Sequence, residues 1–155
     1  MKVYADTNIF TNLWIGLTHS KKAMSLIEEL RSKRAKLPIT RLLRMEMTNA
    51  LQRLVYESRH GAQGIRVSTE TALAAHGNFN EELAAGDFLV RRTVSDDALE
   101  AEFEALAYRH TATEGFRTYD IMHVASALVL ECDTFWSFDG RAKKLADLVG
   151  LRTNH

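Results

Sequence analysis

The chain opens with a short apolar run that stops at an acidic residue, and residues 1–17 read MKVYADTNIFTNLWIGL. The run Val3-Tyr4-Ala5 predicts a short buried strand. Asp6 follows it, and a helical stretch is predicted from residue 8 to residue 17. A strand that leads directly into a helix is the opening unit of an α/β fold.

Strand-like and helix-like segments alternate over the rest of the chain. Further strands are predicted at 36–39, 88–90 and 134–138, where Pro38 fits an edge or a strand start better than a centre. Helices are predicted at 20–30, 40–59, 68–85, 95–107, 118–128 and 142–148, with caps at Ser20, Thr40 and Ser95 and a break near Gly77-Asn78. This alternation predicts a mostly parallel central sheet of four to five strands covered by helices.

Composition limits the function classes. A chain of 155 residues predicts one domain over 1–155, and 20 basic against 20 acidic residues argue against bulk coating of nucleic acid. A local basic patch is still compatible with nucleic acid. The one cysteine, Cys132, excludes an intramolecular disulfide and is interpreted as a small apolar residue. With no signal peptide and no apolar run near the ~20 residues of a membrane helix, a cytoplasmic protein is expected.

Four carboxylates occupy informative positions. Asp6 and Asp139 follow the first and last predicted strands, at the sheet edge where ligands collect in α/β folds. Each also fits a simpler role as the N-cap of the next helix. Glu46 and Asp120 border the apolar stripes of their helices, where a carboxylate is costly unless it pairs with a cation. An arginine such as Arg44 or Arg53 is one such partner for Glu46, and a bound metal is the other.

The positions of the four carboxylates favour their convergence in one shared site, and such a site is expected to bind a metal. Oxygen ligands suit Mg²⁺ or Mn²⁺, and such ions activate water and stabilise charge in phosphodiester hydrolysis. Zinc fits less well, because the sequence has no Cys-x-x-Cys or His-x-x-x-His pattern.

These motifs resemble those of the PIN-domain ribonucleases, particularly the VapC-type toxins of toxin–antitoxin pairs. Four segments carry the resemblance in family order over nearly the whole chain: VYADTNIF at 3–10, RLLRMEMTNAL at 41–51, YDIMHVASAL at 119–128 and FWSFD at 135–139. It implies a PIN-like three-layer α/β/α fold, Mg²⁺ or Mn²⁺ as cofactor, and cleavage of single-stranded or looped RNA. It also implies a small antitoxin partner and a homodimer.

The same resemblance assigns roles to individual residues. Asp6, Glu46, Asp120 and Asp139 would bind metal directly or through water, and Asn8 and Ser137 would hydrogen-bond those carboxylates or the bound water. It says nothing about residues 61–88.

Other residues carry weaker expectations. Five basic residues flank the acidic motifs, and one or two of them are expected to contact substrate phosphate: Arg41, Arg44, Arg117, Arg141 and Lys143. His123 is expected to pack or to support the site rather than to bind metal. Trp14 and Trp136 fit core or dimer packing. Ile15, Leu17, Leu26 and Leu30 fit either a partner surface or the core.

Two alternatives remain beside a metal-dependent endoribonuclease toxin. A haloacid-dehalogenase-type phosphatase also begins with an aspartate after its first strand, but it needs a second aspartate two positions later, where this chain has Asn8. That type of phosphatase also needs a lysine partner for its aspartate, and no such lysine can be identified in the sequence. A catalytically degenerate domain that only binds RNA or a protein partner is the other alternative, against which four mutually repelling carboxylates count.

Overall fold

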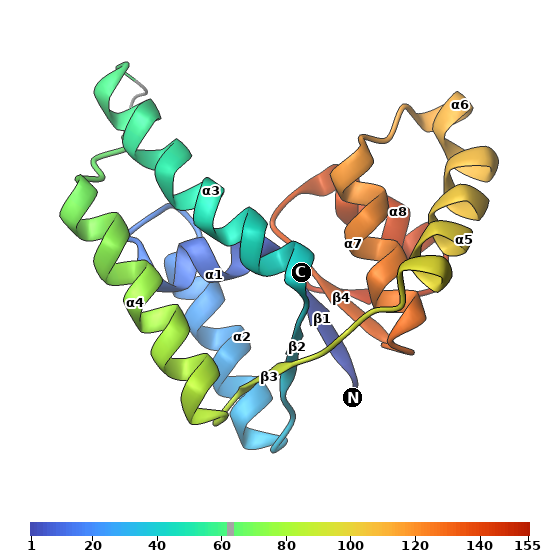
Figure 1. The fold of residues 1–155 in the computed structure, drawn as a ribbon, viewed down its shortest axis with the longest axis horizontal. Coiled ribbons are helices and arrows are strands. Elements are labelled where there is room, and N and C mark those ends of the chain that lie inside the picture. The colour runs from blue at the N-terminus through green and yellow to red at the C-terminus, as the bar shows by residue number, and fades with distance from the viewer. Residues whose placement is uncertain (62–63) are drawn as a thin grey trace.

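The strands lie in a layer between two groups of helices in the computed structural model, which describes residues 1–61 and 64–155 (Figure 1). One ladder has the order β1 (Val3–Ala5), β4 (Thr134–Trp136), β5 (Arg152–Thr153), and the other pairs β2 (Leu37–Ile39) with β3 (Leu89–Arg91). Every pairing is parallel, and β2 contacts β1, so the two ladders adjoin. The predicted parallel α/β fold is confirmed; the short strand β5 was not predicted.

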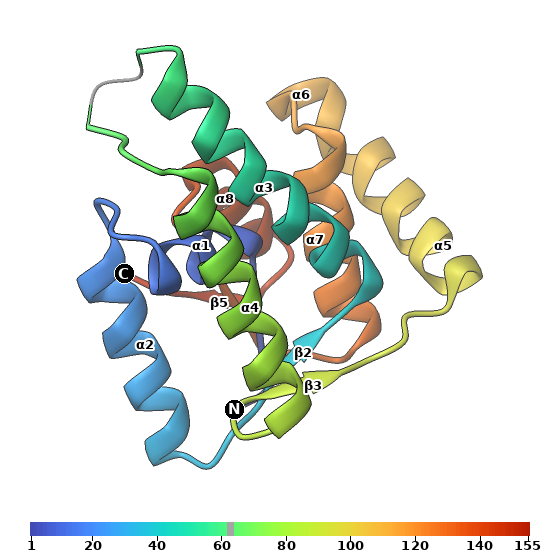
Figure 2. The same cartoon turned by 60° about the vertical axis from the view of Figure 1, so that its left-hand side comes forward.

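The helices divide by position in the chain, as Figures 1 and 2 show. One side carries α1 (Thr7–Trp14), α2 (Ser20–Ser32), α3 (Arg41–Arg59) and α4 (Thr69–Ala85). The other carries α5 (Asp96–Leu106), a π-helical segment (Ala107–Thr111), α6 (Ala112–Glu114), α7 (Thr118–Val129) and α8 (Gly140–Leu148). The result is the three-layer arrangement that the sequence predicted. No helix within the described residues has both the length and the apolar character needed to cross a membrane.

Helix starts follow local capping chemistry. Thr40 accepts a hydrogen bond from the Leu43 amide at 3.2 Å, as predicted, and Ser95 accepts one from the Ala98 amide at 3.4 Å. Ser20 does not cap α2. Its hydroxyl accepts from the Leu17 amide and donates to the Ile15 carbonyl, each at 2.9 Å, and so stabilises the turn after α1. This turn is why α1 ends at Trp14 rather than at residue 17.

The predicted break near Gly77-Asn78 is wrong, because α4 is continuous from Thr69 to Ala85. The next residue, Phe79, is buried and packs edge-on against the rings of Phe10 and Trp14. Tertiary packing here outweighs the low helix propensity of Gly77 and Asn78.

We therefore expect Gly77→Ala to stabilise the protein. Gly77 has ordinary helical backbone, and a Cβ there would meet no atom within 4 Å. Alanine favours the helix over glycine by roughly 0.5–1 kcal/mol, partly through the unfolded chain. Urea unfolding measures this gain; a loss of stability would show that the helix is not continuous in solution.

The apolar residues of the first helices belong to the core. Ile15 and Leu30 are buried, and Leu17 and Leu26 pack against the core in half-buried positions. Of the two roles left open by the sequence, core packing is therefore the correct one for Ile15 and Leu30, while Leu17 and Leu26 keep part of their surface exposed. Trp14 packs against Phe88 as well as Phe10 and Phe79, and Trp136 is buried.

Cys132 behaves as the sequence suggested. It is half-buried against the core, and burial, with a contribution from Asp133, raises the pKa of its thiol to about 11. A thiol that stays protonated at neutral pH is a poor nucleophile and metal ligand.

Candidate active site

Asp6 both caps α1 and faces a cavity. It follows β1 directly, and its Oδ1 accepts a hydrogen bond from the Thr7 amide at 2.7 Å. Asp139 does the same for α8, where its Oδ1 accepts from the Arg141 amide at 2.8 Å. The capping interpretation is thus correct for both residues, and it does not exclude a site, since each side chain also lines the cavity.

Asn8 and Ser137 tie together the segments that follow the neighbouring strands β1 and β4. The Asn8 amide nitrogen donates to Asp6 Oδ2 and to Ser137 Oγ, each at 3.0 Å, and its oxygen accepts from the Phe138 amide at 2.9 Å. Ser137 Oγ donates to Asp6 Oδ2 at 2.8 Å and accepts from the Asp139 amide at 2.9 Å. These contacts fix the orientation of the Asp6 carboxylate.

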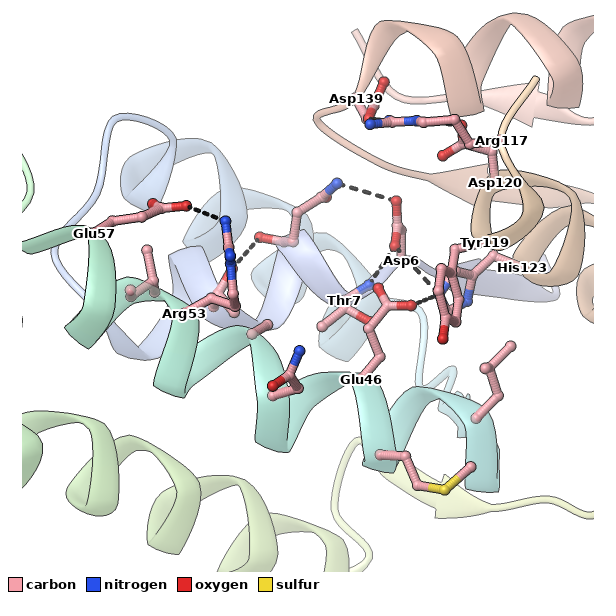
Figure 3. Close-up of a pocket in the computed structure, with 17 residues that line it drawn as sticks. Asp6, Thr7, Glu46, Arg53, Glu57, Arg117, Tyr119, Asp120, His123 and Asp139 are labelled. Atoms are coloured by element: carbon pink, nitrogen blue, oxygen red, sulfur yellow. Dashed lines mark hydrogen bonds and ion pairs between the residues drawn. The ribbon is translucent and has the colours of Figure 1, made fainter. Parts of the chain in front are cut away.

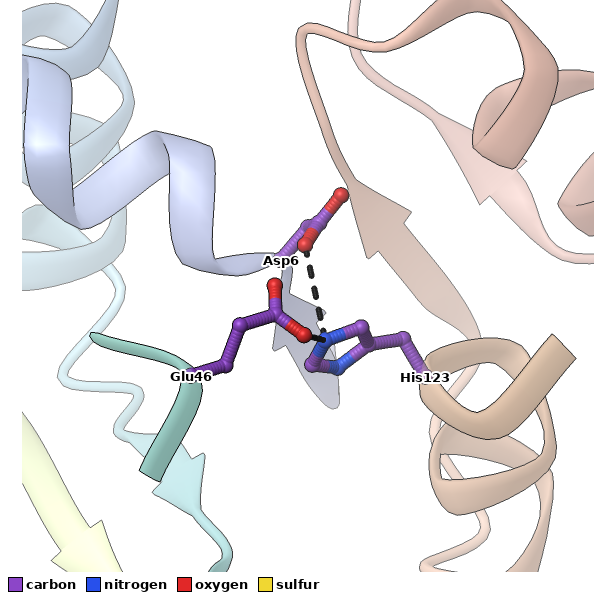
Figure 4. Close-up of side chains that lie close together, drawn as sticks. All are labelled: Asp6, Glu46 and His123. Carbon is purple, nitrogen blue, oxygen red and sulfur yellow. Dashed lines mark hydrogen bonds and ion pairs between the residues drawn. The ribbon is translucent and has the colours of Figure 1, made fainter. Parts of the chain in front are cut away.

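Glu46 reaches the same place from α3, and its cationic partner is a histidine rather than an arginine. His123 on α7 donates from Nε2 to Glu46 Oε2 at 2.8 Å, and the same nitrogen lies 3.7 Å from Asp6 Oδ1 (Figure 4). The other ring nitrogen, Nδ1, bonds to the buried Tyr4 hydroxyl at 2.8 Å. Arg53, considered as a partner from the sequence, pairs with Glu57 instead.

Burial and charge act against each other in this cluster. Burial raises the pKa of Asp6, and Glu46 adds to that rise, while His123 and Ser137 oppose it. Burial also disfavours ionised Glu46, but the hydrogen bond and charge of His123 lower its pKa overall. Burial would lower the pKa of His123, yet the Tyr4 hydroxyl and the two carboxylates raise it well above its usual value. The two carboxylates thus favour the protonated form of the buried imidazole, which would offset part of their mutual repulsion.

Asp120 and Asp139 form a second acidic pair that one arginine bridges. Arg117, just before α7, donates from Nε to Asp120 Oδ2 at 3.2 Å and from Nη2 to Asp139 Oδ2 at 2.8 Å. Asp120, and to a lesser degree Asp139, raise the pKa of Arg117 above its usual value. The Asp120 carboxylate is nearly buried, whereas more than half of the Arg117 side chain is exposed.

All four carboxylates line one cavity of about 740 Å³ between α1, α3 and α7 (Figure 3). The tightest group within the described residues is Asp6, Glu46 and His123, whose ligand atoms lie within 4.8 Å of one another. In Figure 3, Arg53 and Glu57 lie at one end of the cavity and Arg117 with Asp139 at the other. The structure thus brings the predicted acids into one cavity, but as two groups rather than one.

Most of the predicted phosphate-binding residues lie outside this cavity. Of the five, Arg117 lines it, and Arg41, Arg44, Arg141 and Lys143 do not. Arg141 donates to the Gly115 carbonyl at 3.0 Å and Lys143 to the Asn154 carbonyl at 3.1 Å. Their role as substrate contacts stays a prediction.

The donor set fits a divalent cation. Ions of this kind with bonds of about 2.1 Å hold adjacent ligands about 3 Å apart and opposite ligands about 4 Å apart. Glu46 and Asp6 oxygens lie 2.8 Å and 3.7 Å from the same His123 nitrogen. Carboxylates crowded at this spacing in a largely buried site are favourable only with a cation among them.

The family model of the PIN domain matches residues 3–148. The chain belongs to the PIN domain family. No curated protein matches the chain. Solved structures share the PIN fold: VapBC2 from Rickettsia felis bound to a promoter DNA fragment (TM-score 0.68, 13% identity, 99% of this chain and 98% of that chain) and FitAcB from Neisseria gonorrhoeae (0.64, 13%, 99% and 96%). A third is VapC20 from Mycobacterium tuberculosis, a sarcin–ricin loop cleaving toxin (0.60, 17%, 92% and 93%).

Two residues of the PIN-domain cavity were named from the sequence without their observed partners: His123 as a packing or supporting residue, and Arg53 as a partner of Glu46. His123 lies about 60° around α7 from Asp120, which places both on one side of a helix rather than on different sides. Arg53 follows Glu46 by seven residues, which returns it to the same face of α3. For both residues, the spacing from an acidic residue on the same helix indicates that they face the cavity: Asp120 for His123 and Glu46 for Arg53.

The bridging position of Arg117 leads to a prediction. In Arg117→Met, the Asp120–Asp139 pair loses its cation, so a divalent ion should stabilise the variant more than the wild type. We expect the rise in melting temperature with Mg²⁺ or Mn²⁺ to be larger in the variant, measured by thermal unfolding with and without metal. Arg109→Met, on an exposed residue outside the cavity, is the control. Equal rises in all three proteins would contradict this role for Arg117.

Proposed function

We propose that this PIN domain is a Mg²⁺- or Mn²⁺-dependent endoribonuclease that hydrolyses RNA phosphodiester bonds. One observation carries the proposal: Asp6, Glu46, Asp120 and Asp139 come from four separate segments of the chain and line the same cavity. A divalent ion bound there supplies a nucleophile from water near neutral pH and stabilises charge on the phosphate.

The chain's own residues divide the work. Asp6 and Glu46 hold the ion, with Asn8 and Ser137 fixing the Asp6 carboxylate through hydrogen bonds. Asp120 and Asp139 complete the acidic wall of the cavity. The proposal treats all four as metal ligands, direct or through water.

Arg117 and Arg53 place two cationic groups in a cavity whose other charged side chains are mostly acidic. Arg117 presents a mostly exposed guanidinium beside the carboxylates, where a phosphate oxygen can exchange for Asp139. Arg53 lies two turns further along α3 and lines the same cavity, where it can contact a neighbouring phosphate. Backbone contacts of this kind position RNA without reading its bases.

The alternatives receive less support. A phosphatase of the haloacid-dehalogenase type needs an aspartate where Asn8 uses both its amide donors and its acceptor to join two loops. A degenerate binding domain does not explain why the four carboxylates remain together.

We further propose that the chain is a toxin controlled by a small antitoxin. Its fold is shared with VapC20, a sarcin–ricin loop cleaving toxin, and with VapBC2, which is bound to a DNA fragment from its own promoter. A short neighbouring reading frame whose product binds this chain and suppresses its cleavage of RNA is the expected finding. Its absence would leave the nuclease without the toxin role.

The direct test is incubation of the purified protein with total RNA. Cleavage is expected with Mg²⁺ or Mn²⁺ and is expected to stop with a chelator and return when excess metal is restored. Mapping of the new ends identifies the substrate. Intact RNA under every metal condition would overturn the proposal.

A further inference from the structure

One nitrogen of His123, Nε2, faces the cavity together with the carboxylates. His123 is buried, and its Nε2 lies between Glu46 Oε2 at 2.8 Å and Asp6 Oδ1 at 3.7 Å (Figure 4). The proton on this nitrogen therefore occupies the position where two carboxylates from β1 and α3 converge. A cation that replaces it gains both oxygens and the nitrogen.

Tyr4 prepares the ring for this exchange. Its hydroxyl, fully buried in β1, bonds to His123 Nδ1 at 2.8 Å. The hydroxyl can accept a hydrogen bond from Nδ1–H or donate one to an unprotonated Nδ1, so the ring can keep its orientation when an ion replaces the proton on Nε2. Histidines that bind metals usually make such a bond from the nitrogen that does not face the ion, and it fixes their tautomer.

The second acidic pair strengthens the case for this location. Asp120 and Asp139 already have Arg117 as their cation. Asp6 and Glu46 have only the exchangeable proton of His123 between them, apart from hydrogen bonds of neutral groups. The first divalent ion is therefore expected to bind most favourably at the cluster of Asp6, Glu46 and His123.

We propose that Asp6, Glu46 and His123 form a mixed oxygen–nitrogen site that binds Mn²⁺ through His123 Nε2 and prefers it to Mg²⁺. Mg²⁺ takes oxygen ligands almost throughout, whereas first-row transition ions accept imidazole readily. An ion bound at Nε2 displaces the proton that this nitrogen shares with Glu46, and that proton passes to Nδ1 of a neutral ring or to solvent from a charged one. This inference deepens the proposed function, on which it rests for the choice of ion.

The decisive readout is electron spin echo modulation of Mn²⁺ bound to the full chain. A directly bound imidazole nitrogen gives a ¹⁴N modulation that changes on ¹⁵N labelling of histidine. We expect it in the wild type and in His60→Asn, an exposed histidine outside the cavity, and its loss in His123→Asn. Absence of the modulation from wild-type protein saturated with Mn²⁺, or its persistence in His123→Asn, would overturn the proposal.

Affinity measurements extend the test. Calorimetric titration is expected to show Mn²⁺ binding weakened at least tenfold in His123→Asn and about tenfold in Tyr4→Phe, with Mg²⁺ binding changed much less. If His123→Asn does not fold, Tyr4→Phe and the labelled wild type still decide the matter. Equal losses for both ions would contradict the preference that we infer.

The outcome separates this inference from the proposed function. RNA cleavage with Mn²⁺ but no nitrogen modulation would leave the nuclease standing and reject His123 as a ligand. Nitrogen modulation without cleavage of any RNA would confirm His123 as a ligand and reject the nuclease.

Discussion

Asp6→Asn should reduce RNA cleavage by about a thousandfold while leaving the fold intact. The change removes a negative charge that faces Glu46 and the cation site, and a loss of about 4 kcal/mol of transition-state stabilisation corresponds to this factor. Single-turnover cleavage of a mapped RNA substrate measures it. Wild-type cleavage by the variant would remove Asp6 from the proposed site.

The fold should survive because asparagine keeps the shape of Asp6 and its capping oxygen for the Thr7 amide. Burial already raises the pKa of Asp6, so the neutral side chain costs little in the absence of metal. We expect the free energy of unfolding to fall by about 1–3 kcal/mol, because the amide nitrogen that replaces Oδ2 cannot accept the hydrogen bonds of Asn8 and Ser137. Asp97→Asn, on an exposed residue in the first turn of α5, is the matched control and should cleave RNA normally.

Phe79→Ala should destabilise the protein by about 3–5 kcal/mol, a large part of the stability of a domain of this size. Phe79 is 1% exposed and its ring lies 5.9 Å from that of Phe10 and 5.7 Å from that of Trp14. It therefore joins α4 to α1, the helix that Asp6 caps. The loss is measured by urea unfolding monitored by tryptophan fluorescence.

Tyr108→Ala provides the comparison, because Tyr108 is 84% exposed and its loss should alter stability by no more than about 0.5 kcal/mol. A cost below about 1 kcal/mol for Phe79→Ala would mean that α4 is not packed against α1 in solution.

The layers of the fold were predictable because they depend on local signals. Val3–Ala5 and Thr134–Trp136 read as strands, and Thr40 and Ser95 as caps, from the residues themselves. The continuous α4 was not, because the burial of Phe79 that holds it together comes from residues far away in the chain. The strand β5 has only two residues, Arg152 and Thr153, too few to form a pattern.

The site shows the same division. That Asp6 and Asp139 meet was predictable, because they follow parallel strands that are neighbours in the sheet. The partners of the acids were not, because no spacing along the chain connects Glu46 to His123, which are 77 residues apart. Arg117 is one of five basic residues near the acidic motifs. It differs from the other four because α7 and α8 begin beside each other, which lets Arg117 bridge Asp120 and Asp139.

Asn8 is the residue at which this chain differs from phosphatases that use a nucleophilic aspartate. Changing its amide nitrogen to oxygen, a single base change in the codon, would create the Asp-x-Asp opening that nucleophilic-aspartate phosphatases require. Here that oxygen would lose the donors to Asp6 and Ser137 and place a second negative charge 3.0 Å from the Asp6 carboxylate. The loops after β1 and β4 would keep only the hydrogen bond from the Phe138 amide to residue 8, so the amide suits this position better than the acid.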